Sequence, residues 1–200
     1  MPFDTSFDTD RAALLAKLKE KSVFFGDFTL ASGAKSTFYI DCRLTTLDAE
    51  GATLVGRVLN ALIQREIAET NAPVKAVGGL TMGADPVALA IGIASWIEQS
   101  PALLQVFSVR KAPKAHGQTK LIEGNFSPGD TVVVLDDVVT KGDSTLRAIE
   151  SVEQAGGKVA FVAVLVDREE GGADKIRALG HKVIAAFKRV ELTGDLSARA

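Results

Sequence analysis

The chain has 200 residues, of which 46% are hydrophobic and 24% charged, as in an ordinary globular domain. Its 23 Lys and Arg against 25 Asp and Glu give a net charge of −2, which excludes the broad positive field of sequence-independent nucleic-acid binding. One cysteine cannot form an internal disulfide, no apolar run reaches the roughly 18–20 residues of a membrane span, and the acidic, polar start is unlike a secretory signal. We therefore expect a soluble cytoplasmic protein of one domain, residues 1–200, with no nucleic acid and no membrane among its partners.

The first predicted elements are a helix and two short strands. Apolar and cationic residues alternate at helical spacing from residue 9 or 10 to about Lys21. The runs Val23–Leu30 and Ser36–Asp41 are rich in Phe and flank a Gly-containing turn, which predicts a pair of strands. We expect the Phe side chains to form the core of this small β subregion.

The rest of the chain alternates strands and helices. A 3.6-residue apolar stripe predicts a helix from Asp48 to about Glu69. Five apolar runs without polar alternation are typical of strands buried on both faces: Lys75–Leu80, Leu103–Arg110, Thr131–Asp136, Lys158–Asp167 and Lys182–Phe187. Helices are predicted between these runs at Asp85–Glu98, Ser144–Gln154 and Ala173–Leu179. This alternation predicts an α/β fold with a mostly parallel central sheet flanked by helices.

One polar stretch interrupts the alternation. Residues 111–124, KAPKAHGQTKLIEG, separate two predicted strands and carry Lys111, Lys114, His116 and Lys120. A long cationic excursion in a compact α/β domain is more often functional than idle. A run of charge is also compatible with a solvated hairpin, and composition alone leaves both interpretations open.

The strongest chemical signal follows the strand predicted at Thr131–Asp136. Asp136 and Asp137 stand at its end, before a Gly-containing turn and a helix that starts near Ser144. Ligands of open α/β sheets bind at the carboxyl ends of the strands. Backbone N–H groups at a helix start suit a phosphate dianion, and the hydroxyls that can assist belong to Thr140, Ser144 and Thr145.

The acidic pair suits a different part of a ligand. Carboxylates accept hydrogen bonds from sugar hydroxyls, and their charge favours the Mg²⁺ complex of a polyphosphate. Taken alone, the pair could simply precede a capped helix. The sequence contains no G-x-x-x-x-G-K-[ST] run and no G-x-G-x-x-G after a predicted strand, which excludes a P-loop protein and a dinucleotide-binding Rossmann enzyme.

Several segments together resemble a known family. Residues 132–145, VVVLDDVVTKGDST, resemble the phosphoribosyl pyrophosphate (PRPP) signature of type I phosphoribosyltransferases. Residues 110–117, RKAPKAHG, are similar to the R-K-x-x-K-x-H-G catalytic loop of the orotate phosphoribosyltransferase family. The runs at 28–41 resemble the N-terminal hood of that family, and VDREEGG at 166–172 resembles its D-R-x-E-x-G segment. The resemblance implies the type I phosphoribosyltransferase fold, with a helix and hood at 1–45, a PRPP-binding core at 72–190 and a mobile catalytic loop at 110–124.

The resemblance also implies a role for individual residues. Asp136 and Asp137 would hold the ribose hydroxyls, and the 5′-phosphate would be held by Thr140, Lys141, Gly142, Asp143, Ser144 and Thr145. Val138 and Val139 would also belong to the PRPP site. The pyrophosphate would be contacted by Arg110, Lys111, Lys114 and His116, with Lys114, His116 and Asp137 as catalytic residues. Orotate would lie against Tyr39 and Ile40 near Thr140, with Arg168 facing its carboxylate. The loop Gly78–Gly83 would lie under the pyrophosphate, with a non-proline cis peptide bond at Leu80–Thr81.

The activity implied is Mg²⁺-dependent transfer of the 5-phosphoribosyl group from PRPP to orotate, a glycosyltransferase reaction that gives orotidine 5′-monophosphate and pyrophosphate in de novo pyrimidine (UMP) biosynthesis. Mg²⁺ would be held mainly through PRPP, with no direct protein ligands. The resemblance further implies a homodimer with shared active sites. Ala31 and Met82 stand where many members of the family have Lys. Transfer to another base, or a non-catalytic PRPP-binding regulator, remain alternative hypotheses.

Overall fold

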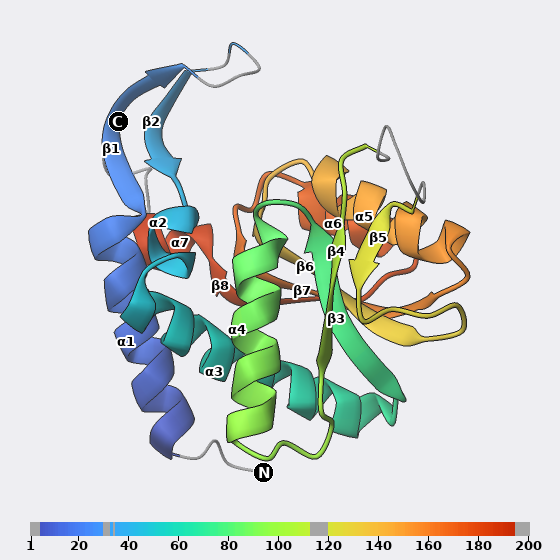
Figure 1. The fold of residues 1–200 in the computed structure, drawn as a ribbon. Coiled ribbons are helices and arrows are strands. Elements are labelled where there is room, and N and C mark those ends of the chain that lie inside the picture. The colour runs from blue at the N-terminus through green and yellow to red at the C-terminus, as the bar shows by residue number, and fades with distance from the viewer. Residues whose placement is uncertain (1–4, 30–32, 34, 113–119, 195–200) are drawn as a thin grey trace.

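A computed structural model describes residues 5–29, 33, 35–112 and 120–194. Its centre is a six-stranded sheet in the order β5-β4-β3-β6-β7-β8 (Figure 1). The strands are β3 (Val74–Leu80), β4 (Gln105–Val109), β5 (Ile122–Gly124), β6 (Thr131–Val139), β7 (Lys158–Asp167) and β8 (Val183–Lys188). All neighbouring pairs are parallel except β4 and β5, which are antiparallel. The predicted mostly parallel sheet is confirmed.

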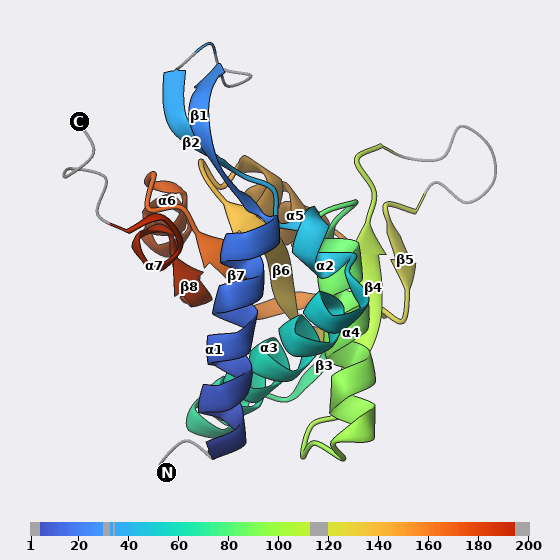
Figure 2. The same ribbon diagram turned by 90° about the vertical axis from the view of Figure 1, so that its left-hand side faces the viewer.

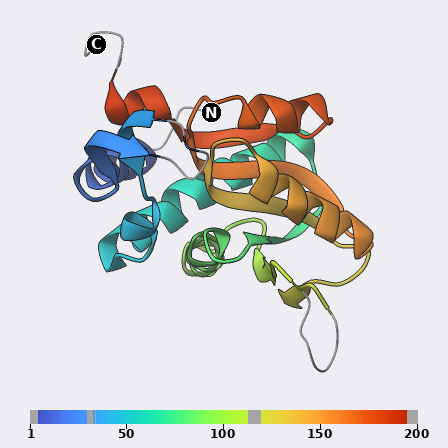
Figure 3. The same cartoon turned by 90° about the horizontal axis from the view of Figure 1, so that it is seen from above.

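Helices cover both faces of this sheet (Figure 3). They are α1 (Thr5–Lys21), α2 (Arg43–Thr46), α3 (Ala49–Thr70), α4 (Ala84–Ile97), α5 (Asp143–Gln154), α6 (Gly172–Ala178) and α7 (Arg189–Thr193). Side chains alternate along β6: Val133 and Leu135 pack with α1, α3 and α4, whereas Val132 and Val134 pack with α5 and α6. Burial on both faces explains why the strands are continuous apolar runs. No helix in the described part of the chain has the length and apolarity needed to cross a membrane.

A separate hairpin rises from the end of α1 (Figure 2). Its strands β1 (Val23–Thr29) and β2 (Lys35–Ile40) pair antiparallel, with a bulge between Phe25 and Phe28. Phe38 is buried, but Phe24 and Phe25 are 42% and 50% exposed. The expected Phe core of this subregion is therefore wrong for these two residues, because a two-stranded hairpin has too little of the chain packed against it to cover both faces.

Three short elements were not predicted, and some boundaries differ. α2, α7 and β5 have four, five and three residues, too few to show a period. β5 lies inside the stretch expected to be loop, at Ile122–Gly124. β6 continues to Val139, so Asp136 and Asp137 lie within a strand rather than after it. α1 begins at Thr5, four or five residues before the predicted start.

Candidate active site

A cavity of about 370 Å³ opens at the carboxyl ends of β3 and β6. After β3 the chain adds β4 on one side, and β6 then joins β3 on the other side. This reversal of strand order is where open α/β sheets bind their ligands. Four segments line the cavity: Tyr39–Arg43 from the end of β2 to α2, Leu80–Gly83 from the end of β3, Lys111 after β4, and Asp136, Asp137, Val138, Thr140 and Ser144 from β6 to α5. Eight of the residues expected from the sequence to bind PRPP or orotate therefore lie around one hollow.

The acidic pair forms the deepest polar part of this cavity. Asp136 and Asp137 are only 7% and 8% exposed. Asp136 accepts hydrogen bonds from the Thr145 hydroxyl (2.7 Å) and from the Asp137 N–H (3.1 Å), and Asp137 accepts one from the Val138 N–H (3.0 Å). Burial, followed by the charge of Asp137, raises the pKa of Asp136 to about 7. Burial also raises the pKa of Asp137. Two buried carboxylates with spare acceptor capacity favour a ligand that brings hydroxyl donors.

The loop after β3 lies against this pair. A Cβ atom on Gly83 would stand 2.4 Å from Asp137 Oδ1, so only glycine lets the backbone approach the carboxylate this closely. The non-proline cis peptide bond of this loop is Thr81–Met82, one residue later than the Leu80–Thr81 bond that we expected. The expectation rested on the family resemblance, and no proline marks the bond in the sequence.

Asp85, in the first turn of α4, stabilises the same loop through hydrogen bonds. Its carboxylate accepts hydrogen bonds from the Thr81 hydroxyl (2.5 Å) and from the Ser108 hydroxyl at the end of β4 (2.6 Å). The Thr81 N–H donates to the Val109 carbonyl at 2.8 Å. Sequence reasoning did not include Asp85 among the site residues, because an acidic residue at a helix start has an ordinary structural explanation.

The loop from β6 to α5 has the geometry of an anion site at a helix start. Gly142 adopts a left-handed conformation (φ 80°), and the Gly172 N–H donates to the Thr140 carbonyl at 3.0 Å. A Cβ atom on Gly172 would stand 2.6 Å from that carbonyl oxygen, so the loop rests directly on the start of α6. Ser144, the second residue of α5, lines the cavity, so the start of this helix lies at its wall.

Four side chains that we expected to contact PRPP pack or pair with other residues instead. Thr145 is fully buried, and its hydroxyl bonds to Asp136 because it lies on the inward face of α5. Asp143 pairs with Lys175 of α6 at 2.7 Å. The Lys141 ammonium donates to the Glu170 carbonyl at 3.3 Å, and Val139 is buried in the core. Thr145, Lys141, Asp143 and Val139 therefore do not line the cavity with their side chains.

The structure describes part of the expected cationic loop at 110–124, namely residues 110–112 and 120–124. Lys111 lines the cavity, and its carbonyl accepts a hydrogen bond from Arg147 of α5 at 3.1 Å. Arg110 does not line it: its guanidinium lies 3.9 Å from Glu123 and donates to the Ala112 carbonyl at 3.3 Å. The expected catalytic residues Lys114 and His116 lie outside the described residues, as does Ala31.

The expected orotate residues are divided between the cavity and its surroundings. Tyr39 and Ile40 line the cavity, whereas Arg168, the residue after β7, does not. The Arg168 side chain is 7% exposed, 2.6 Å from Glu170 and stacked 5.2 Å from the Phe38 ring. Its Nε atom is buried without a hydrogen-bond partner among the described residues. Arg168 is therefore buried, whereas the Glu170 side chain that pairs with it is 27% exposed.

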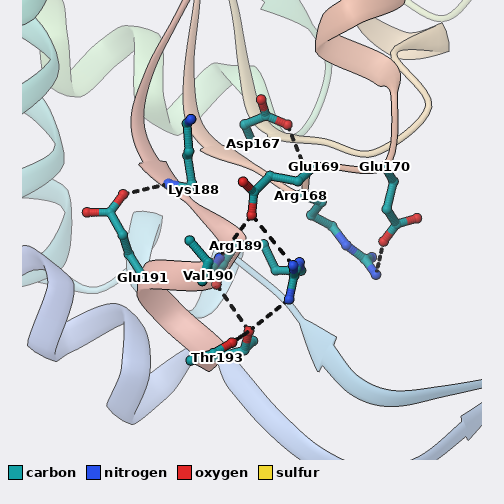
Figure 4. A network of polar contacts seen from close by, with 10 residues as sticks. Asp167, Arg168, Glu169, Glu170, Lys188, Arg189, Val190, Glu191 and Thr193 are labelled. Atoms are coloured by element: carbon teal, nitrogen blue, oxygen red, sulfur yellow. Dashed lines mark hydrogen bonds and ion pairs between the residues drawn. The ribbon is translucent and has the colours of Figure 1, made fainter. Parts of the chain in front are cut away.

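The segment that carries Arg168 is tied to the C-terminal helix (Figure 4). Glu169 has a left-handed backbone (φ 58°), and its carboxylate accepts a hydrogen bond from the Val190 N–H at 3.2 Å. The Glu169 N–H donates to Asp167 at 2.9 Å. These contacts hold the turn after β7 in one shape and so fix the position of the Arg168 backbone.

Two further residues of the cavity were not predicted. Arg43, the first residue of α2, donates from Nε and Nη2 to the two carboxylate oxygens of Asp41, both at 2.8 Å. The hydrogen bonds from Arg43 hold the pKa of Asp41 below its ordinary value. The only signal in the sequence is the spacing of opposite charges in Asp41-Cys42-Arg43, which is too common to mark a site.

The hollow at the reversal point, with its buried acidic pair and the helix start beside it, fits the type I phosphoribosyltransferase class that the sequence resembles. No family model matches the chain. It is 46% identical over 171 residues to the orotate phosphoribosyltransferase of Streptomyces avermitilis, covering 86% of this chain and 90% of the relative. The chain belongs to the orotate phosphoribosyltransferase family.

Solved structures agree with this assignment. The Mycobacterium tuberculosis orotate phosphoribosyltransferase in complex with Fe(III) dicitrate has a TM-score of 0.78 and 38% identity, over 92% of this chain and 99% of that one. The same enzyme in complex with PRPP has a TM-score of 0.72 and 32% identity, over 92% of each chain. The type I phosphoribosyltransferase fold expected from the sequence is confirmed.

Proposed function

We propose that this chain transfers the 5-phosphoribosyl group of PRPP to orotate, forming orotidine 5′-monophosphate and pyrophosphate in de novo pyrimidine biosynthesis. The observation that carries the proposal is the buried pair Asp136–Asp137 beside the loop at the start of α5. It occurs in a chain that is 46% identical to a relative named orotate phosphoribosyltransferase. A relative of the same family has been solved with PRPP bound.

The ribose and the 5′-phosphate of PRPP fit the two polar parts of the cavity. Asp136 and Asp137 would accept the ribose hydroxyls, and the Thr145 hydroxyl would hold Asp136 in position for this task. The backbone N–H groups between Thr140 and Ser144 would bind the 5′-phosphate. The Leu80–Gly83 loop and Lys111 would border the pyrophosphate, together with Lys114 and His116 of the catalytic loop.

The reaction breaks the bond from ribose C1 to the pyrophosphate oxygen, and the electron pair leaves with pyrophosphate. A bond forms from C1 to the ring nitrogen of orotate, through an oxocarbenium-like transition state. Negative charge grows on the leaving group, so cations fixed around it favour the transition state over the ground state. Orotate is already anionic, and no strong protein base is required. Tyr39 and Ile40 would position its ring, with Arg168 on the side of its carboxylate.

The donor groups of the cavity fit a magnesium ion that is carried mainly by the substrate. The described residues contain no group of three or more His, Cys, Asp or Glu side chains that could hold a metal by themselves. Asp136 and Asp137 supply two nearby carboxylates, and Mg²⁺ is commonly held by one or two carboxylates plus substrate phosphates. When bound, the ion would add positive charge beside the leaving pyrophosphate.

We also propose a homodimer that buries the outer face of α4. Leu89, Ile93, Trp96 and Ile97 on this helix are between 51% and 70% exposed, and Leu103 before β4 is 45% exposed. Contiguous apolar surface of this kind usually marks an interface. The face adjoins β4, the strand from which the 110–124 loop departs (Figure 2). A second copy seated there would bring its own loop beside the neighbour's cavity.

Trp96→Glu tests the dimer by sedimentation velocity. We expect the variant to be a monomer with little activity, whereas a wild-type enzyme that is monomeric and fully active would contradict the shared site. Mixing Lys114→Ala and Asp137→Asn chains provides a second test. Activity should return in the mixture if each site takes residues from both copies.

The activity itself is tested by the loss of orotate absorbance in the presence of PRPP and Mg²⁺, with each component omitted in turn. Adenine, hypoxanthine and uracil serve as parallel acceptors. We expect turnover when orotate is the acceptor and none with adenine, hypoxanthine or uracil. Turnover of a purine instead would support another phosphoribosyltransferase, and PRPP binding without any turnover would support a regulator.

A further inference from the structure

Arg43 lines the cavity, and the function proposed above gives it no role. It lines the hollow together with Gly83 and Asp137, and its side chain is 52% exposed. The chain reaches it directly from β2, through Asp41 and Cys42. Cys42 is fully buried, which anchors the backbone at this point. Arg43 is therefore held at the wall of the site while its charged end remains accessible.

The pairing with Asp41 orients Arg43 without using up its donors. A guanidinium carries five N–H groups in one plane. Asp41 accepts from Nε and from one N–H of Nη2, each at 2.8 Å, so that three N–H groups remain for another acceptor. A fork of this kind removes the rotational freedom of the side chain before a ligand arrives. An anion that reaches the cavity would meet a cation already in position.

The neighbours of Arg43 indicate which anion this is. Arg43 is close enough to Asp137 for its charge to act on the pKa of that carboxyl. Asp137 in turn lies against Gly83, at the end of the loop after β3. The start of α5, proposed for the 5′-phosphate, borders the same cavity through Ser144. Arg43 shares the cavity with the Leu80–Gly83 loop, which the resemblance places under the pyrophosphate.

The charges of the side chains that line the cavity also point to the pyrophosphate group. Among the described side chains that line the cavity, Asp41, Asp136 and Asp137 are acidic, and only Arg43 and Lys111 are cationic. A diphosphate carries more negative charge than any other part of the substrates and has most need of cations. We propose that Arg43 binds the pyrophosphate group of PRPP and of the product, a role that rests on the proposed function.

The test is the binding of inorganic pyrophosphate with Mg²⁺, measured by isothermal titration calorimetry, beside steady-state kinetics. Arg43→Gln should weaken pyrophosphate binding and raise KM for PRPP by about tenfold to a hundredfold, as for the loss of a charge-assisted hydrogen bond. KM for orotate should change less than about threefold. Arg43→Lys should recover part of the binding, because it restores the charge but not the fork.

Two matched variants make the result specific. Arg177→Gln removes an arginine of similar exposure (45%) that pairs with Asp174 at 2.8 Å far from the cavity, and it should change neither constant. Met82→Lys, placed on a side chain of the cavity that is 61% exposed, should restore much of the pyrophosphate binding to Arg43→Gln. A merely structural role for Arg43 would not be rescued from this position.

Unchanged pyrophosphate binding in a folded Arg43→Gln protein would overturn the proposal. So would a rise in KM for orotate without one for PRPP, which would assign Arg43 to the orotate carboxylate. If Arg43→Gln fails to fold, the test passes to Arg43→Lys, which must raise KM for PRPP more than KM for orotate. Failure of the proposed function is distinguished by the wild-type protein, which would then bind pyrophosphate without converting orotate.

Discussion

Replacing Thr145 by Val removes one hydroxyl and almost nothing else from the site. Thr145 is fully buried, and its Oγ1 donates to Asp136 Oδ2 at 2.7 Å. Valine has the same shape, so packing is kept while a buried carboxylate loses a donor. A hydrogen bond to a charged group contributes about 1.5–3 kcal/mol, and one pKa unit corresponds to about 1.4 kcal/mol. The bond lowers the pKa of Asp136, which stands at about 7 with the bond in place.

Loss of the bond should therefore raise the pKa of Asp136 by about one unit or more. We expect Thr145→Val to raise KM for PRPP by at least about threefold at pH 7.5, because the protonated carboxyl accepts ribose hydroxyls poorly and a shift of one pKa unit lowers its deprotonated fraction about threefold at this pH. In the wild-type enzyme KM for PRPP should rise as the pH falls through about 7, and in the variant the rise should begin at higher pH. Initial rates across pH 6–9 measure both effects.

Two controls accompany this series. Thr145→Ser keeps the hydroxyl and should retain most of the affinity for PRPP. Thr70→Val removes a hydroxyl that bonds to the Glu66 carbonyl at the end of α3, and it should leave KM unchanged. A Thr145→Val enzyme with wild-type KM and an unshifted pH profile would refute the idea that this hydroxyl prepares Asp136 for PRPP.

Three further outcomes are expected. Because the pKa of Asp136 is higher in the folded chain (about 7) than its ordinary 3.8, the folded state binds more protons between these values, and the free energy of unfolding falls as the pH rises through this window. Asp136→Asn should thus raise the free energy of unfolding of the ligand-free protein by up to about 4 kcal/mol at pH 8 and by little near pH 4. Urea denaturation measures this difference. If the variant is no more stable than the wild type at pH 8, the inference that Asp136 is an unfavourably buried charge is wrong. Gly83→Ala places a Cβ atom 2.4 Å from Asp137 Oδ1 and should raise KM for PRPP more than about tenfold in a folded enzyme, and an unchanged KM would show that the loop moves freely. Lys114→Ala should lower kcat by about a hundredfold to a thousandfold with a smaller effect on PRPP affinity; intact steady-state and single-turnover rates would make the loop a solvated hairpin.

The parts of the fold that the sequence predicted share a physical cause. Strands buried on both faces and helices with one apolar stripe leave strong patterns, and β3, β6, β7 and α3 were all placed within a few residues. The acidic pair was singled out because it stands at the carboxyl end of a long apolar run, inside a segment that resembles the PRPP signature. β6 ends three residues later than predicted, because Val138 and Val139 continue the ladder with β7 past the two carboxylates.

The parts that were not predicted depend on contacts between distant segments. Arg43 is part of the cavity only because the hairpin brings the Asp41–Arg43 segment over β3 and β6. Thr145 bonds to Asp136 because of the orientation of α5, which a motif cannot give. Phe24 and Phe25 are exposed because strand periodicity predicts a face but not what covers it. Spacing along one segment thus located the region of the site, but which side chains of that segment line the cavity depends on tertiary placement.

The most direct measurement is the joint yield of orotidine 5′-monophosphate and pyrophosphate from orotate, PRPP and Mg²⁺, quantified by chromatography. The wild-type chain should form the two products in equal amounts. A variant with both Asp136→Asn and Asp137→Asn should form neither at PRPP concentrations that saturate the wild type. Equal yields from the variant would place the reaction outside the cavity between β3 and β6, and no product from the wild type would contradict the proposed transfer.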